Sequence, residues 1–151
     1  MIGTITKDVE IADALAHVAG YTCLNDVSAR ELQGSNGGQW TLGKAIDTFL
    51  PMGPWLVTAD EVPDPQELAI RCVLNGDVVQ DSTTAQMVFG VAELIAFISR
   101  TMTLEPGDVI ATGTPPGVGF ARKPPVYLKD GDEVTIDIER IGSLTNPVRR
   151  P

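Results

Sequence analysis

The feature that most constrains the fold is a pair of short strand-like segments joined by Asn75-Gly76. Between residues 68 and 74 every second side chain is apolar and uncharged, which is the period of a strand with one buried face. Asn-Gly supplies the two positive-φ positions of a type I′ turn, so residues 77–80 are predicted to return as the antiparallel partner. The residues on the alternating face are Leu68, Ile70, Cys72 and Leu74.

Two other segments have the spacing of amphipathic helices. Residues 8–18 open with acidic side chains and carry apolar residues at i, i+4 and i+7 before Gly20, which predicts a short first helix. Residues 91–102 carry five apolar residues on one face and predict a second helix, followed by a tight turn at Pro106-Gly107. The apolar positions are Ile11, Leu15 and Val18 in the first segment and Val91, Leu94, Ile95, Ile98 and Met102 in the second.

The rest of the chain is punctuated by glycine and proline. Residues 109–111 are predicted as a short buried strand that runs into a Gly- and Pro-rich loop at 112–119. Residues 129–132 read as a turn, and residues 134–138 alternate as a strand with one buried face. Many short strands with two or three helices predict a mainly β, α+β fold with a mixed sheet. A chain of 151 residues is long enough for one compact domain.

Composition excludes several classes of function. The formal net charge is −9 and the basic residues form no stripe, so binding to a nucleic-acid backbone is not expected. No apolar run approaches the roughly 20 residues that span a bilayer, and no membrane association is expected. Cys23 and Cys72 lie in apolar segments without CxxC spacing, which favours buried free thiols over a disulfide. These features predict a soluble, cytoplasmic protein.

A cluster of polar residues between Gly20 and Gln33 is the first candidate site. Asp26 follows an apolar stretch and could donate an oxygen to a hard cation, but the local sequence favours a capping role at a turn or helix beginning at Ser28. Arg30 could present its planar guanidinium to a carboxylate, or could form a solvated pair with its neighbour Glu31. Gln33 could orient a water or a substrate oxygen, although the local sequence favours a surface amide.

Two more candidates lie further along the chain. Lys44 has apolar neighbours, so its ammonium is either drawn into a partly buried site or extends along the surface. Residues 112–114 offer hydroxyl and backbone N–H groups that suit a carboxylate or an oxyanion. The only histidine, His17, is expected to be structural, because no G-x-S-x-G elbow accompanies it. Neither a P-loop nor a G-x-G-x-x-G fingerprint occurs, so no nucleotide cofactor is indicated.

These segments, taken in order, resemble the fumarylacetoacetate hydrolase family, which includes isomerases and decarboxylases of 2-hydroxymuconate-type acids from aromatic catabolism and acylpyruvate hydrolases. The resemblance covers nearly the whole chain and rests on several motifs in the same order. The motifs are Ala19-Gly20-Tyr21-Thr22, Asn25-Asp26-Val27-Ser28-Ala29-Arg30, Gly43-Lys44, Asp47-Thr48-Phe49, Met52-Gly53-Pro54-Trp55, Asn75-Gly76, Ser99-Arg100, Met102 to Asp108, Thr112-Gly113-Thr114-Pro115, Gly117-Val118-Gly119, Ile141-Gly142 and Asn146-Pro147.

The resemblance implies a β-roll-like fold of the family's C-terminal domain type, a Mg²⁺ or Mn²⁺ cofactor, a small 2-oxo or enol acid substrate and a homodimer. It implies that Asp26 is a carboxylate metal ligand and that Lys44 is the catalytic lysine. It also places Arg30, Gln33 and Thr114 at substrate-binding positions. A divalent ion that polarises a chelated oxo-acid stabilises the enolate formed by C–C cleavage, decarboxylation or proton shift.

One departure from the family pattern limits these expectations. Family members carry two further metal ligands as a Glu-x-Glu pair on a strand before the point that matches Met1, and residues 1–151 contain no counterpart; Asp8 and Glu10 have the wrong spacing. The chain is therefore expected to be a single catalytic domain, truncated at its N-terminus. Three hypotheses follow: a metal-dependent enzyme, an inactive homologue that keeps the fold and dimer surface, or a site completed by another chain. Truncation would also expose a sheet edge and favour self-association.

Overall fold

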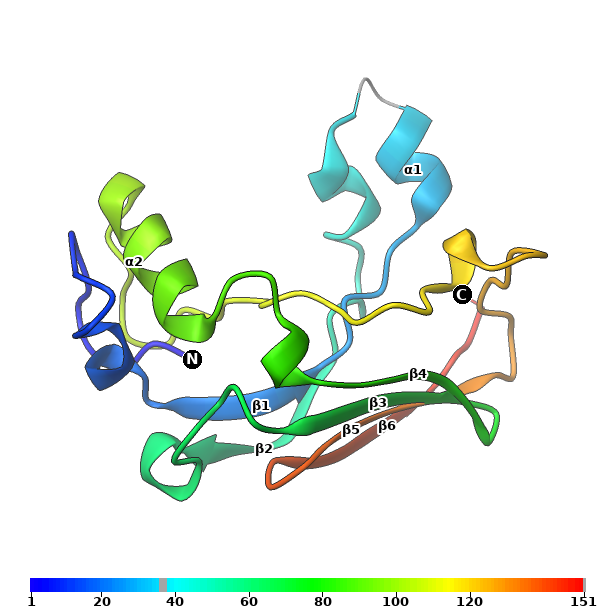
Figure 1. The fold of residues 1–151 in the computed structure, drawn as a ribbon. Helices are drawn as coiled ribbons and strands as arrows, with labels where there is room; N and C mark the ends of the chain where they lie inside the picture. The colour runs from blue at the N-terminus through cyan, green and yellow to red at the C-terminus, as the bar shows by residue number, and fades with distance from the viewer. Residues whose placement is uncertain (36–37, 151) are drawn as a thin grey trace.

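The computed structural model describes residues 1–35 and 38–150. Within them, strands form two sheets and two α-helices stand on the same side of these sheets (Figure 1). The helices are α1 (Arg30–Ser35) and α2 (Val91–Thr101). The strands are β1 (Gly20–Leu24), β2 (Met52–Thr58), β3 (Ala69–Leu74), β4 (Asp77–Thr83), β5 (Glu133–Ile138) and β6 (Gly142–Pro147). Short 3₁₀ turns cover Ala14–His17, Trp40–Gly43, Ala59–Glu61, Thr84–Gln86 and Gly119–Ala121.

The larger sheet has the strand order β4-β3-β5-β6 and confirms the predicted hairpin. Asn75 and Gly76 have φ values of 52° and 88°, the left-handed conformation that the type I′ turn requires. Cys72 of β3 pairs with Gln80 of β4 and with Ile136 of β5, and the register of β3 against β4 shifts between Cys72 and Val73. Every strand pairing among the described residues is antiparallel, so the mainly β fold is confirmed without the mixture of parallel and antiparallel strands that was expected.

The smaller sheet, β1 paired with β2, packs against β5 and β6 through the main apolar core. Each fully buried aliphatic side chain in such a core contributes roughly 1.5–3 kcal/mol by leaving water. Trp55 of β2 adds a polar contact, because its indole N–H donates to the carbonyl oxygen of Ile141 at 2.7 Å. This core holds the end of β1 in place, and β1 leads directly into the candidate site. Its buried members are Cys23, Val57, Val62, Leu68, Val134, Ile136, Ile141 and Leu144.

Helix α2 confirms the second predicted helix and packs into a separate small core. The helix begins at Val91, whose N–H donates to the side-chain oxygen of Gln66 at 2.8 Å, while the Glu93 carboxylate accepts from the N–H of Gly90 at 2.7 Å. These contacts satisfy backbone donors that a helix N-terminus leaves free. Ile95 is 2% exposed and packs with Ile2, Ala14 and Leu104. Met102, expected on the same face, lies just beyond the helix and is exposed.

Two predicted elements are wrong. In place of a helix over residues 8–18 there is one 3₁₀ turn, Ala14–His17, because Ile11 and Leu15 stay exposed and offer no apolar face to bury. Asp8 has a φ of 52°, which also breaks any helix at that point. Residues 109–111 are not a strand and have no ladder partner among the described residues. No helix in residues 1–35 or 38–150 has the length and apolar character needed to cross a membrane.

Both cysteines are free thiols, as predicted. Cys23 is fully buried and its thiol donates to the carbonyl oxygen of Gly142 at 3.0 Å. Burial raises the pKa of the Cys23 thiol to about 11 and also raises the pKa of Cys72. A raised thiol pKa keeps the group protonated and unreactive at neutral pH.

We therefore expect Cys23 to be alkylated by iodoacetamide at pH 8 about 100-fold more slowly than a free cysteine, because its thiolate fraction is that much smaller. Cys72, which is only partly buried, should react faster than Cys23. Mass spectrometry of timed samples measures both rates, and the same reaction in urea provides the unfolded control. Labelling of native Cys23 at the free-thiol rate would contradict this prediction.

Candidate functional site

The site is built on the hairpin of helical turns that follows β1. Helix α1 and the 3₁₀ turn Trp40–Gly43 lie against each other, and Gly43 sits at their contact. A Cβ atom at Gly43 would lie 2.8 Å from the carbonyl oxygen of Ala29 and 2.8 Å from Cβ of Gln33, so only glycine fits. The N–H of Ala29 donates to the Gly43 carbonyl oxygen at 2.8 Å. This close approach carries Lys44 to the start of the hairpin, where Asp26 lies.

Asp26 and Lys44 form an ion pair across 18 residues of sequence. The two side chains are 42% and 32% exposed, so the pair is accessible to solvent. Ion pairs of this exposure contribute about 0–1 kcal/mol to folding, which makes a purely structural role weak. The Asp26 carboxylate is thus engaged by an ammonium, while Ser28 donates its hydroxyl to the Asp26 main-chain oxygen at 3.2 Å. This arrangement favours the site interpretation over helix capping and over a freely solvated lysine.

Arg30 and Gln33 form a second linked pair. The Arg30 guanidinium donates to the side-chain oxygen of Gln33 at 2.8 Å and lies 4.3 Å above the ring of Phe120. Gln33 is 7% exposed, so the prediction of a surface amide is wrong. Its Nε2 atom is buried and has no hydrogen-bond partner. A buried donor left unpaired costs roughly 1–3 kcal/mol, so a hydrogen-bond acceptor placed beside Nε2 of Gln33 would stabilise the protein.

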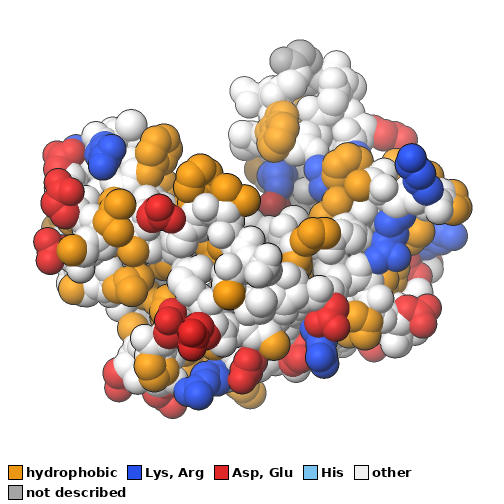
Figure 2. All heavy atoms as spheres, in the orientation of Figure 1, with side chains coloured by type: hydrophobic (Ala, Val, Ile, Leu, Met, Phe, Trp, Pro, Cys, Tyr) orange, Lys and Arg blue, Asp and Glu red, His pale blue; other side chains and the backbone are white. Residues whose placement is uncertain are grey.

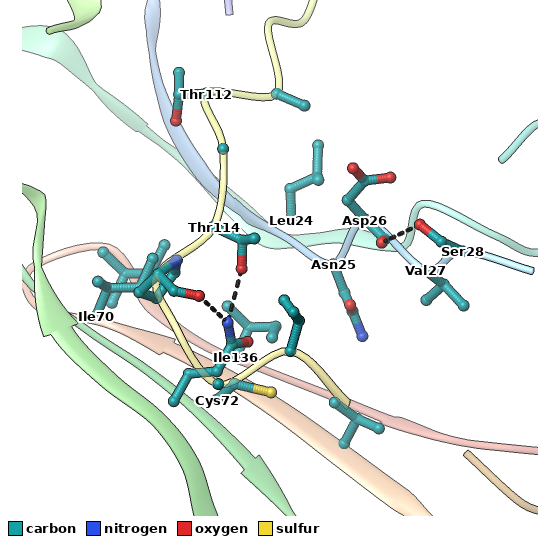
Figure 3. Close-up of a pocket in the computed structure, with 18 of the residues that line it drawn as sticks. Leu24, Asn25, Asp26, Val27, Ser28, Ile70, Cys72, Thr112, Thr114 and Ile136 are labelled. Atoms are coloured by element: carbon teal, nitrogen blue, oxygen red, sulfur yellow. Dashed lines mark hydrogen bonds between the residues drawn. The ribbon is translucent and has the colours of Figure 1, made fainter. Parts of the chain in front are cut away.

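Thr114 belongs to the opposite wall. It lies in the irregular loop predicted from its glycines and prolines, with Thr112 and Gly113 beside it. Its hydroxyl accepts a hydrogen bond from Nε2 of Gln80 at 2.9 Å. In Figure 3, Thr114 and Asp26 lie on either side of Leu24 at the edge of one cavity, which both residues line. Residues far apart in sequence therefore face the same space.

That cavity has a volume of about 960 Å³. It lies between two lobes: the α1 lobe, formed by α1 and the turn Trp40–Gly43, and the lobe that carries α2. Figure 2 shows the molecule hollowed between these lobes, with charged side chains of both signs at the foot of the α1 lobe. The floor is apolar and includes Ile70 and Cys72 of β3 and Ile136 of β5. A polar end on an apolar chamber suits a small molecule with one charged head.

The structure brings the predicted residues together unequally. Asp26, Arg30 and Thr114 line the cavity, whereas Lys44 and Gln33 reach it through their contacts with Asp26 and Arg30. His17 bonds to the Thr4 hydroxyl at 2.8 Å, at the end of its 3₁₀ turn and outside the cavity lining, as expected for a structural residue.

Sequence reasoning missed part of the wall. Tyr21, near the start of β1, and Asn25, just after its end, border the cavity, and burial raises the pKa of the Tyr21 hydroxyl. Gln80 borders it from β4, and Phe120 borders it from the 3₁₀ turn Gly119–Ala121. Gln80 lies on the strand that returns from the Asn75-Gly76 turn, opposite Cys72, and this pairing was the available signal.

The residues present do not make a metal site by themselves. Within residues 1–35 and 38–150, no three His, Cys, Asp or Glu side chains come together in a way that could hold a metal ion. Asp26 supplies one carboxylate, and hard divalent cations draw on several oxygen ligands. The described side chains therefore fit, at most, one position of a metal shell.

Comparison with known proteins gives consistent results. Residues 1–149 match the family model described as fumarylacetoacetate (FAA) hydrolase C-terminal. The chain is 57% identical over 149 residues to the mitochondrial oxaloacetate tautomerase FAHD2A of Bos taurus, covering 98% of this chain and 48% of that protein. The chain thus spans about half the length of the curated relatives it matches.

Solved structures show the same fold. A fumarylacetoacetate hydrolase from Exiguobacterium antarcticum superimposes with a TM-score of 0.95 at 46% identity, covering 100% of this chain and 54% of that one. A maleylpyruvate hydrolase from Sphingobium sp. SYK-6, in complex with manganese(II) and pyruvate, superimposes with a TM-score of 0.85 at 40% identity. The second match covers 99% of this chain and 51% of the hydrolase.

Proposed function

Because this chain belongs to the fumarylacetoacetate hydrolase family, we propose that it supplies one half of a metal-dependent active site for a small 2-oxo or enol acid. The reaction is a hydrolysis, isomerisation, tautomerisation or decarboxylation that passes through an enolate. The observation that carries the proposal is that Asp26, which is paired with Lys44, lines a cavity whose other wall carries Thr114. Two relatives, one named as an oxaloacetate tautomerase and the other as a maleylpyruvate hydrolase, support the substrate class.

The described side chains suggest a role for each residue. Thr114 and Arg30 bind the acid end of the substrate, because one offers a hydroxyl and the other a planar set of N–H donors. Gln33 holds the Arg30 guanidinium in place, because its side-chain oxygen accepts a hydrogen bond from Arg30 at 2.8 Å. Lys44 places a positive charge beside the region where negative charge develops, which favours the enolate over the starting acid.

A divalent cation, Mg²⁺ or Mn²⁺, belongs to this proposal, and the relative solved with manganese supports it. Asp26 would contribute one oxygen. The other ligands would be waters, oxygens of the substrate and carboxylates that the described residues do not bring to Asp26, supplied by a Glu-x-Glu segment or by another chain. A homodimer and a cytoplasmic location also remain proposals, and several relatives carry mitochondrial names.

The activity can be tested with oxaloacetate and Mn²⁺. We expect the purified protein to speed the disappearance of the enol form well above the buffer rate, and Asp26→Asn to remove most of that acceleration because it removes the carboxylate. The absorbance of the enol follows the reaction. Asp47→Asn, an acidic residue outside the cavity lining, serves as the matched control and should behave as wild type. No acceleration by the wild type would contradict the proposal.

A second candidate is a non-catalytic chain that keeps the fold and the dimer surface. The absence of a three-ligand cluster among the described residues favours it. Such a protein should bind Mn²⁺ only weakly, since one carboxylate is a poor site for a hard cation. Calorimetry that found micromolar Mn²⁺ affinity, lost in Asp26→Asn, would exclude this candidate and support the enzyme.

A further inference from the structure

Gln80 is a cavity residue with no role in the proposed chemistry so far. It lies on β4, and its Nε2 atom makes two contacts with the Gly- and Pro-rich loop. One is with Oγ1 of Thr114 at 2.9 Å and the other is with the main-chain oxygen of Pro115 at 2.6 Å. A single amide group thus holds two consecutive residues of the loop.

These contacts determine which way the Thr114 hydroxyl donates. The main-chain oxygen of Pro115 can only accept, so the amide atom facing it must be the NH₂ group rather than the carbonyl oxygen. The second hydrogen of that NH₂ group is then available for Thr114 Oγ1, which accepts it. A hydroxyl has a single proton, so the proton of Thr114 stays free to point toward the cavity.

The neighbouring packing keeps the Gln80 side chain from changing its orientation. Arg122 donates to the carbonyl oxygen of Gly117 at 2.9 Å and also to the carbonyl oxygen of Val79, which ties the loop to β4. Gly117 leaves no room for a side chain, because an added Cβ would overlap the Val79 carbonyl and lie 3.1 Å from Cγ of Gln80. The stem of Gln80 is therefore confined while its amide engages the loop.

We infer that Gln80 is a positioning residue that sets the Thr114 hydroxyl as a hydrogen-bond donor to the ligand. The inference rests on the proposed function and narrows it: the group bound at Thr114 must be an acceptor, and the carboxylate of an oxo-acid in its ionised form meets that requirement. Gln80 acts through Thr114 and does not itself contact the reacting atoms.

The test is a double-mutant cycle on oxalate binding, measured by calorimetry with Mn²⁺ present. Thr114→Val removes the donor and is expected to weaken oxalate binding about 10-fold. Gln80→Met keeps the length of the side chain but removes the donor that makes Thr114 Oγ1 an acceptor, so the hydroxyl is free to rotate and binding should also weaken about 10-fold. The double variant should bind no more weakly than either single variant.

Controls separate this positioning role from general damage. Gln86→Met changes an exposed glutamine outside the cavity and should bind as wild type. Urea unfolding of Gln80→Met shows whether the variant is folded, and the coupling with Thr114→Val, rather than the size of one effect, decides the outcome. Wild-type affinity in Gln80→Met, or fully additive losses in the double variant, would overturn the inference. If the wild type itself binds no oxalate, the proposed function fails and the inference fails with it.

Discussion

Replacing Lys44 with methionine is expected to lower turnover of oxaloacetate about 100-fold or more, while the free energy of unfolding changes by less than about 1 kcal/mol. Preorganised charge near a developing negative charge is usually worth a factor of about 100 to 1,000 in rate. The side chains of the pair are 32% (Lys44) and 42% (Asp26) exposed, so the loss of the pair should affect stability only slightly. Methionine keeps much of the apolar stem and removes only the ammonium.

The rate and the stability must be measured on the same preparation. Enol absorbance follows turnover, and urea unfolding gives the free energy. Lys129→Met is the matched control, because Lys129 is exposed and outside the cavity lining. A Lys44→Met variant with wild-type turnover would show that Lys44 is not the catalytic lysine, whereas a large loss of stability would show that its role is structural.

The largest effect on folding is expected from Gly117→Ala. Gly117 has a φ of 114°, which disfavours any residue with a Cβ, and the new methyl group would overlap the main-chain oxygen of Val79. Strained backbone and overpacking each cost on the order of 1–3 kcal/mol, so the variant should lose about 3 kcal/mol or more. Urea unfolding measures the loss, and cavity binding should weaken because the loop carries Thr114.

Gly113→Ala is the matched control for this substitution. Gly113 has nearly the same φ, 112°, but an added Cβ would meet no atom within 4 Å. It should therefore show the backbone strain alone, about 1 kcal/mol. Equal losses in the two variants would mean that close packing of the loop against β4 does not contribute to stability.

The parts of the fold that could be predicted from sequence are those with strong local signals. The Asn75-Gly76 turn admits few alternatives, and the alternating residues 134–138 form β5 as expected. Helix α2 matches its prediction within one residue, because its apolar face packs onto a core and Gln66 and Glu93 satisfy its N-terminus. In these segments, local preference and tertiary packing agree.

The predictions failed where the local pattern found no partner. Residues 8–18 have helical spacing, yet the structure buries Ala14 rather than Ile11 or Leu15. Just before this segment, Thr6 forms an isolated β-bridge with Leu104. Residues 109–111 have the apolar character of a strand but no ladder among the described residues. Spacing shows which side chains could be buried together, but tertiary contacts decide whether a surface is there to bury them.

By itself, the sequence determined the family, a mainly β fold with the Asn75-Gly76 hairpin, and the kinds of chemical group at the candidate site: one carboxylate, one ammonium, one guanidinium and a threonine loop. Only the tertiary structure decided how they meet. The glycine contact at Gly43 brings Lys44 to Asp26, and burial leaves Gln33 with an unpaired donor. The Gln80 side chain on β4 meets the loop residue Thr114 through a hydrogen bond. The physical reason is that a hydrogen bond or ion pair depends on separation in space, which residues far apart in sequence acquire only when the chain folds.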